Sequence, residues 1–112
     1  MIKYGGKHML ISYEGQDFKE VIDRPGLVLV DFYATWCGPC KMLMPQLEAL
    51  SEEQPQIPFV KVDIDQHKPL AKETYGVTSV PTLVLFKDGV EVSRQSGFAP
   101  KDAVFKWIQA NK

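Results

Sequence analysis

Ala34–Lys41 reads ATWCGPCK and contains the only two cysteines of the chain, Cys37 and Cys40. An almost continuously apolar run over residues 27–32 precedes it, which is typical of a strand buried on both faces. Residues 42–53 follow with the apolar period of a helix. A strand would carry the cysteines to the open end of a sheet, and a helix start would surround them with unpaired backbone N–H groups that stabilise a thiolate. We therefore expect a reversible dithiol/disulfide here.

The spacing of the two cysteines suits a disulfide. Residues at i and i+3 of a first helical turn share a face about 5–6 Å apart, which is the span that the bond needs. Gly38 allows a tight turn, and Pro39 supplies a preset φ where its missing N–H costs nothing. Cys37, at the helix start, feels more of the N-terminal field than Cys40. We predict that Cys37 attacks as the thiolate and that Cys40 resolves the mixed disulfide.

Three other interpretations of the pair stay open at this point. A zinc site needs four ligands, and only His8 and His67 remain as histidine ligands. A purely structural disulfide would close too short a loop to restrain the unfolded chain much. The cysteines would otherwise be two incidental buried thiols. The surrounding Trp36, Gly38 and Pro39 favour the redox pair over all three.

Length and composition indicate a single globular domain. The chain has 112 residues, is 45% hydrophobic and 24% charged, and carries a net charge of −1. Its scattered lysines and arginines argue against a nucleic-acid surface or a polybasic membrane contact. No apolar run approaches the length of a transmembrane helix. Residues 1–8 lack the apolar centre of a secretory signal, so we expect a flexible N-terminal segment and a cytoplasmic protein.

Alternating apolar patterns and turn residues predict a mixed sheet with helices on both faces. Asp88-Gly89 is typical of a tight two-residue hairpin turn, and Gly76 is expected to end the third helix. Pro45 lies inside the second helix, and the last helix is expected to bury Val104, Trp107 and Ile108. The predicted strands are residues 9–13, 27–32, 57–63, 82–87 and 90–95, and the predicted helices are residues 18–22, 42–53, 69–75 and a last one from Pro100.

Trp36–Lys41 resembles the active-site sequence of the thioredoxin family, and the resemblance extends from about Met9 to the C-terminus. The dipeptide between the cysteines differs from the Pro-Tyr of glutaredoxins, the Gly-His of protein disulfide isomerases and the Pro-His of periplasmic oxidases. The resemblance implies an α/β thioredoxin fold over residues 9–112, with a central mixed five-stranded sheet flanked by four helices. Further matching segments are Val30-Asp31-Phe32, Pro45, Val62-Asp63-Ile64-Asp65, Val80-Pro81-Thr82-Leu83 and Phe86-Lys87-Asp88-Gly89.

Asp31 is a candidate catalytic residue because it is a carboxylate inside an apolar strand. Burial makes its ionised form costly, so its pKa is expected to rise. The resemblance places Asp31 beneath Cys40, where it would accept the proton of the resolving thiol, and places Lys61 as its charged partner. A tolerated carboxylate near a strand end and a simple edge lysine are the alternatives. Tyr33 departs from the family, since many thioredoxins carry tryptophan at this position.

The resemblance also implies a substrate groove around the cysteines. It predicts a cis peptide bond between Val80 and Pro81 that would expose the Val80 backbone for pairing with an extended substrate segment. Trp36 is expected in an apolar docking lip, with an ordinary core tryptophan as the alternative. The residues assigned to the groove are Trp36, Gly38, Pro39, Gly76, Val80, Pro81 and Gly97.

These features predict a protein-disulfide reductase that maintains cellular redox homeostasis by thiol–disulfide exchange through Cys37 and Cys40. The chain would bind no cofactor, and the resemblance implies that an NADPH- and flavin-dependent thioredoxin reductase reduces the pair again. Expected partners are this reductase and disulfide-containing proteins, with no nucleic acid or membrane, and the chain is expected to be a monomer. A dithiol oxidant or isomerase and a redox-independent binding module are the rival interpretations.

Overall fold

One mixed sheet organises the molecule, with strand order β1-β3-β2-β4-β5. The computed structural model describes residues 10–112, so the expected flexibility of residues 1–8 lies outside the described part. Strands β1, β3 and β2 run parallel, whereas β4 and β5 pair antiparallel to their neighbours. This agrees with the fold class expected from the sequence. In chain order the elements are β1 (Leu10–Ser12), α1 (Phe18–Ile22), β2 (Leu27–Tyr33), α2 (Gly38–Glu53), β3 (Phe59–Asp63), the π-helix η1 (Pro69–Thr74), β4 (Thr82–Lys87), β5 (Val90–Ser96) and α3 (Lys101–Ala110).

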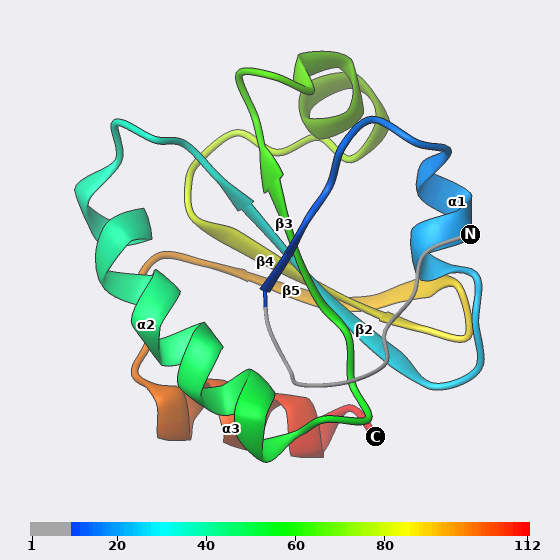
Figure 1. Cartoon of the computed structure of the whole chain (residues 1–112), viewed down its shortest axis with the longest axis vertical. Coiled ribbons are helices and arrows are strands. Elements are labelled where there is room, and N and C mark those ends of the chain that lie inside the picture. The colour runs from blue at the N-terminus through cyan, green and yellow to red at the C-terminus, as the bar shows by residue number, and fades with distance from the viewer. Residues whose placement is uncertain (1–9) are drawn as a thin grey trace.

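The central strand β2 is buried on both faces because helices cover each side of the sheet. Val28, Val30 and Phe32 pack in the cluster that includes α1 and η1. Leu29 belongs to the opposite cluster, which includes α2 and α3. Figure 1 shows α2 and α3 on one side of the sheet and α1 on the other. The apolar run that predicted a doubly covered strand is therefore confirmed.

Helix α2 begins at Gly38, four residues before the predicted start. The apolar stripe reveals only where the helix contacts the core, and the first turn lies outside that stripe. Cys37 is the N-cap, and Pro39 occupies the first turn, where it needs no hydrogen-bond donor. The stripe itself is confirmed, since Leu43, Leu47 and Leu50 are fully buried.

The start of β3 and the type of the third helix also differ from the sequence-based expectation. Strand β3 begins at Phe59 rather than at Ile57, because Pro58 has no N–H for the ladder, although its carbonyl accepts from Leu29 N at 3.0 Å. The predicted helix over residues 69–75 is a π-helix, in which Tyr75 N donates to Leu70 O at 3.1 Å.

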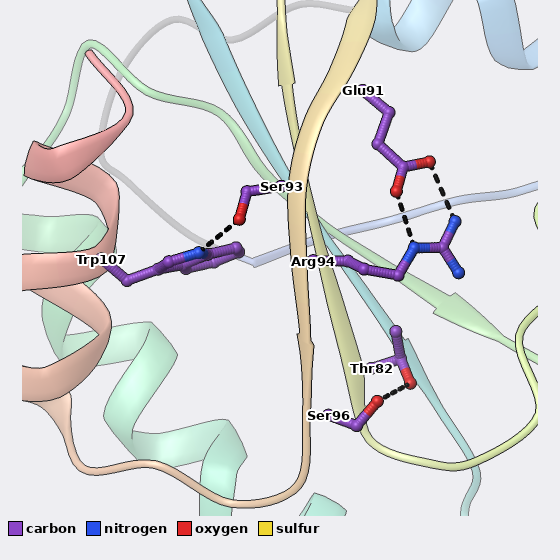
Figure 2. Close-up of polar contacts among 6 residues, drawn as sticks. All are labelled: Thr82, Glu91, Ser93, Arg94, Ser96 and Trp107. Carbon is purple, nitrogen blue, oxygen red and sulfur yellow. Dashed lines mark hydrogen bonds and ion pairs between the residues drawn. The ribbon is translucent and has the colours of Figure 1, made fainter.

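The hairpin joining β4 and β5 has the predicted turn. Asp88 and Gly89 both have positive φ, 52° and 84°, as a type I′ turn requires. A side-chain hydrogen bond links α3 to β5 (Figure 2). The Trp107 indole N–H donates to Ser93 Oγ at 2.8 Å. Val104 and Ile108 are buried as predicted, whereas Trp107 is half-buried and packs against the edge of the core, where its polar bond to the exposed β5 accounts for its position. Within residues 10–112, no helix is long and apolar enough to cross a membrane.

Leu47→Ala tests the packing of α2 on the sheet. Removing three carbons from this fully buried side chain is expected to lower the free energy of unfolding by about 2–5 kcal/mol. Urea denaturation of the oxidised protein measures the loss. Val90→Ala is the control, because Val90 is exposed and its truncation should change stability by less than about 0.5 kcal/mol. Equal losses in both variants would contradict this account of the core.

Candidate active site

The two cysteines lie where β2 passes into α2. Cys37 caps the N-terminus of α2 and Cys40 lies in its first turn. The two are joined by a disulfide, with their Cα atoms 5.2 Å apart, as the spacing predicted. They pack with Ala34 in a small apolar cluster that Tyr33 and Val80 border. The strand thus delivers the pair to the end of the sheet, and the helix orients it.

The two sulfurs have different surroundings. Cys37 Sγ accepts a hydrogen bond from Cys40 N at 3.1 Å and lies 3.7 Å from Val80 O. Cys40 is 1% exposed and Cys37 is 5% exposed, so Cys37 is the more accessible sulfur-bearing residue. A backbone N–H aimed at a sulfur at a helix N-terminus stabilises negative charge on that sulfur.

Asp31 lies on the face of β2 that α2 covers. It is fully buried, and among residues 10–112 neither carboxylate oxygen has a hydrogen-bond partner. Burial raises the pKa of Asp31 from its ordinary 3.8 to about 7, and the positive charge of Lys61 opposes part of that rise. A buried carboxyl with a pKa near neutrality is suited to accepting and releasing a proton.

Lys61 is directly opposite Asp31 in the parallel pairing of β2 with β3. Among residues 10–112 the two side chains form no ion pair. Lys61 therefore affects the pKa of Asp31 through its charge alone and not through a direct contact. The Lys61 ammonium lies 5.9 Å from the centroid of the Tyr33 ring. Burial, then the charges of Asp63 and Asp31, raise the pKa of Tyr33. Tyr33, Lys61 and Asp63 line a cleft of about 260 Å³.

Hydrogen bonds fix the loop before β4, whose residue Val80 packs beside the cysteines. The peptide bond between Val80 and Pro81 is cis, as expected from the resemblance. Gly97 N donates to Pro81 O at 2.8 Å, with Gly97 at a φ of 92° that favours glycine. Thr82 Oγ1 donates to Ser79 O at 2.7 Å. Figure 2 shows the Thr82 hydroxyl within 3.0 Å of the hydroxyl of Ser96 on β5.

A groove of about 420 Å³ runs beside this loop. Trp36 is 67% exposed, so the alternative of a core tryptophan is wrong. Its indole N–H donates to Asp65 Oδ2 at 2.9 Å, which fixes the ring at the edge of the groove. The groove is lined by Trp36, Ile64, Asp65, Lys68, Lys72, Val77, Thr78, Ser79 and Val80.

The structure brings only part of the predicted groove together. Trp36 and Val80 line the groove, whereas five other predicted residues do not: Gly38, Pro39, Gly76, Pro81 and Gly97. Pro81 and Gly97 support the loop through their backbone bond, and Gly38 and Pro39 form the exposed first turn of α2. Sequence reasoning missed Asp65, Lys68 and Lys72. Asp65 lies in a segment that resembles the family, but nothing local in the sequence indicates that it contacts Trp36.

Within residues 10–112, no group of three or more histidine, cysteine, aspartate or glutamate side chains is placed to hold a metal ion. Both cysteines are engaged with each other. A disulfide between residues i and i+3 at a helix N-terminus is typical of a thiol–disulfide oxidoreductase.

Comparison with known proteins agrees with this class. The family described as Thioredoxin matches residues 9–110. The thioredoxin of Chlamydia trachomatis is 55% identical over 87 residues, which cover 78% of this chain and 84% of that relative. Thioredoxin-1 of Saccharomyces cerevisiae is 46% identical over 95 residues, covering 85% and 90% of the two chains. The structure of a mutant thioredoxin from Halobacterium salinarum superposes with a TM-score of 0.84 at 38% identity, covering 95% and 94%.

The chain belongs to the thioredoxin family. Its activity is therefore thiol–disulfide exchange through the Cys37–Cys40 pair, and it is a protein-disulfide oxidoreductase.

Asp31→Asn tests the buried carboxyl through the pH dependence of stability. The unfolded carboxyl releases its proton near pH 4 and the folded one near pH 7, so the folded state binds more protons between these values. The contribution of Asp31 to the free energy of unfolding is therefore fully present below pH 4, and it is lost as the pH rises through 7. Above pH 7 the variant should be more stable by up to about 4 kcal/mol, and near pH 4 the two should be similar.

Urea denaturation of the oxidised proteins between pH 4.5 and 8.5 measures this difference. Glu48→Gln is the matched control, because Glu48 is an exposed carboxylate on α2. Its unfolding curve should follow that of the wild-type protein at every pH. Parallel pH profiles for Asp31→Asn and the wild-type protein would show that Asp31 titrates as an ordinary surface carboxyl.

Proposed function

We propose that this chain reduces protein disulfides with Cys37 as nucleophile and Cys40 as resolving thiol. The observation that carries the proposal is the asymmetry of the pair. Cys37 lies at the helix N-cap, is the more exposed of the two, and its sulfur accepts the Cys40 N–H. All three favour a thiolate on Cys37 and access by a partner.

The reaction then proceeds in two exchanges. In the first, the Cys37 thiolate attacks one sulfur of a target disulfide, forms a mixed disulfide with it and expels the other target sulfur as a thiolate. In the second, Cys40 loses its proton and attacks Cys37 Sγ. The bond between Cys37 and the target breaks, the target leaves fully reduced, and the chain is left with the Cys37–Cys40 disulfide.

Asp31 is proposed as the acceptor of the Cys40 proton. Its pKa of about 7 matches the task, because an acceptor far more acidic would take the proton poorly and one far more basic would already hold it. Lys61 moderates that pKa through its charge.

The groove is proposed to hold an extended segment of the target. Val80 links the two parts of the site, because its carbonyl lies 3.7 Å from Cys37 Sγ and its residue lines the groove. A target cysteine bonded to Cys37 would therefore place its neighbouring residues along Val80 and Trp36. Gly38 and Pro39 follow Cys37 in the first turn of α2, and the bond from Gly97 N to Pro81 O supports the loop that carries Val80. Gly76 is proposed to keep the groove open, because it directly precedes Val77, which lines it.

A second protein would have to restore the dithiol after each turnover. We propose that an NADPH- and flavin-dependent thioredoxin reductase reduces the disulfide again, so the chain itself would need no bound cofactor. We also propose a monomeric, cytoplasmic protein whose domain comprises residues 9–112. The family match over residues 9–110 and the continuous packing from Leu10 to Ile108 support that domain.

Serine variants separate the roles of the two cysteines. Cys37→Ser should abolish turnover of protein disulfides, because no thiolate remains to attack the target. Cys40→Ser should form stable mixed disulfides with its targets, which accumulate as species sensitive to reductant on non-reducing gels. Normal turnover by Cys40→Ser would refute the resolving role. Activity that survives the double serine variant would favour the binding-module interpretation.

The reduction potential of the pair distinguishes a reductant from an oxidant. Titration against a thiol buffer, read by alkylation, should place it near the ~−270 mV typical of thioredoxins. A value above about −200 mV would instead favour the oxidant or isomerase, on the same scale. Ser93→Ala is a suitable control, since it removes only the distant bond to Trp107 and should leave the potential unchanged.

A further inference from the structure

Two lysines form part of the groove that Trp36 and Val80 line beside the active site. Lys68 and Lys72 both line it, and both are exposed. Lys68 is the N-cap of η1 and Lys72 lies in its last turn, so one short segment presents two positive charges to the same space. In the described part of the chain, neither ammonium forms an ion pair. Their charge is therefore available to a ligand in the groove.

The groove contains little negative charge to oppose these lysines. Asp65 is the one carboxylate that lines it among the described residues, and that carboxylate already accepts the Trp36 indole N–H at 2.9 Å. The rest of the lining is apolar or carries hydroxyl groups. The chain as a whole has a net charge of −1, so this local excess of positive charge has the opposite sign to the protein's overall charge.

Val80 connects the groove that contains the two lysines with the reacting sulfur. Val80 O lies 3.7 Å from Cys37 Sγ, and the groove extends from Val80 to Lys68 and Lys72. Any peptide held through a cysteine at Cys37 and passing along Val80 therefore enters the field of both ammonium groups. Charge in such a surface groove attracts the opposite charge and accelerates encounter.

We propose that this groove selects protein disulfides whose reacting cysteine has aspartate or glutamate residues close to it in sequence. The proposal rests on the disulfide-reductase function proposed above and specifies its substrate class. Lys68 and Lys72 are specificity-determining residues that bind the acidic side chains, while Trp36 and Val80 contact the apolar part of the segment. The attraction between these acidic side chains and the two ammonium groups would favour both capture of the target and its retention during the second exchange.

Matched peptide disulfides test the selection. Three peptides share one sequence and differ only in the two residues on each side of the cysteine, which are glutamate, glutamine or lysine. Stopped-flow rates for reduction by the reduced chain should be on the order of three- to tenfold higher for the glutamate peptide than for the lysine peptide at low salt. The ratio should fall toward one as ionic strength rises. The net charge of the protein alone would predict the opposite order.

Variants locate the effect in the groove. Lys68→Gln combined with Lys72→Gln should bring the glutamate-to-lysine rate ratio close to one, and Lys68→Glu combined with Lys72→Glu should invert it. The matched control is Lys87→Gln with Lys112→Gln, which removes the same charge from a separate pocket. That control should keep the wild-type ratio. Thermal unfolding checks that each variant is folded, and each ratio is taken within one variant.

The outcomes distinguish the inference from the function on which it rests. A wild-type ratio near one, with the glutamine peptide still reduced, would overturn the selection and leave the reductase intact. An equal loss of the ratio in the control would assign it to overall charge and also overturn the selection. No reduction of any peptide would overturn both. Only a ratio above about three that disappears with Lys68 and Lys72 alone supports the assignment.

Discussion

The burial of β2 on both faces is the constraint on which the rest of the structure depends. Its apolar side chains join one cluster with α1 and η1 and another with α2 and α3, so this single strand holds both layers of helices to the sheet. The end of β2 is thereby fixed relative to α2, and Cys37 lies at that junction. The neighbours of β2 position the other site groups, Lys61 in the middle of β3 and Pro81 just before β4. Hydrophobic packing far from the sulfurs thus determines where the sulfurs lie.

Asp31 is the exception to the apolar character of this strand. A buried carboxylate without a hydrogen-bond partner costs stability whenever it is ionised, and the field of Lys61 offsets only part of that cost. A fold selected for stability alone would place an apolar residue here. The penalty leaves a group that changes protonation state near neutral pH in the strand that leads to the cysteines. With the proton-accepting role proposed for Asp31, stability would be exchanged for reactivity at this one position.

Much of the fold and the chemical centre could be predicted because their signals are local. The cysteine pair, the apolar run of β2 and the Asp-Gly turn each lie within a few residues, and each was confirmed. The start of α2 was predicted too late, because its first turn is held by the Cys37 cap rather than by an apolar stripe. The groove was predicted least well. Trp36 is hydrogen-bonded to Asp65, which is 29 positions away in the sequence. Lys68 and Lys72 line the same groove only because the tertiary fold brings these segments together.

The two edges of the sheet disfavour pairing with strands of other chains. A protein that accepts extended foreign segments risks pairing them, or a second copy, along any open strand. At one edge β1 is only three residues long. At the other, β5 carries the Glu91–Arg94 ion pair seen in Figure 2, and its register with β4 is interrupted between Leu85 and Phe86. Short, charged or irregular edges resist pairing with further strands, so neither edge of this sheet is a favourable place for another chain to add.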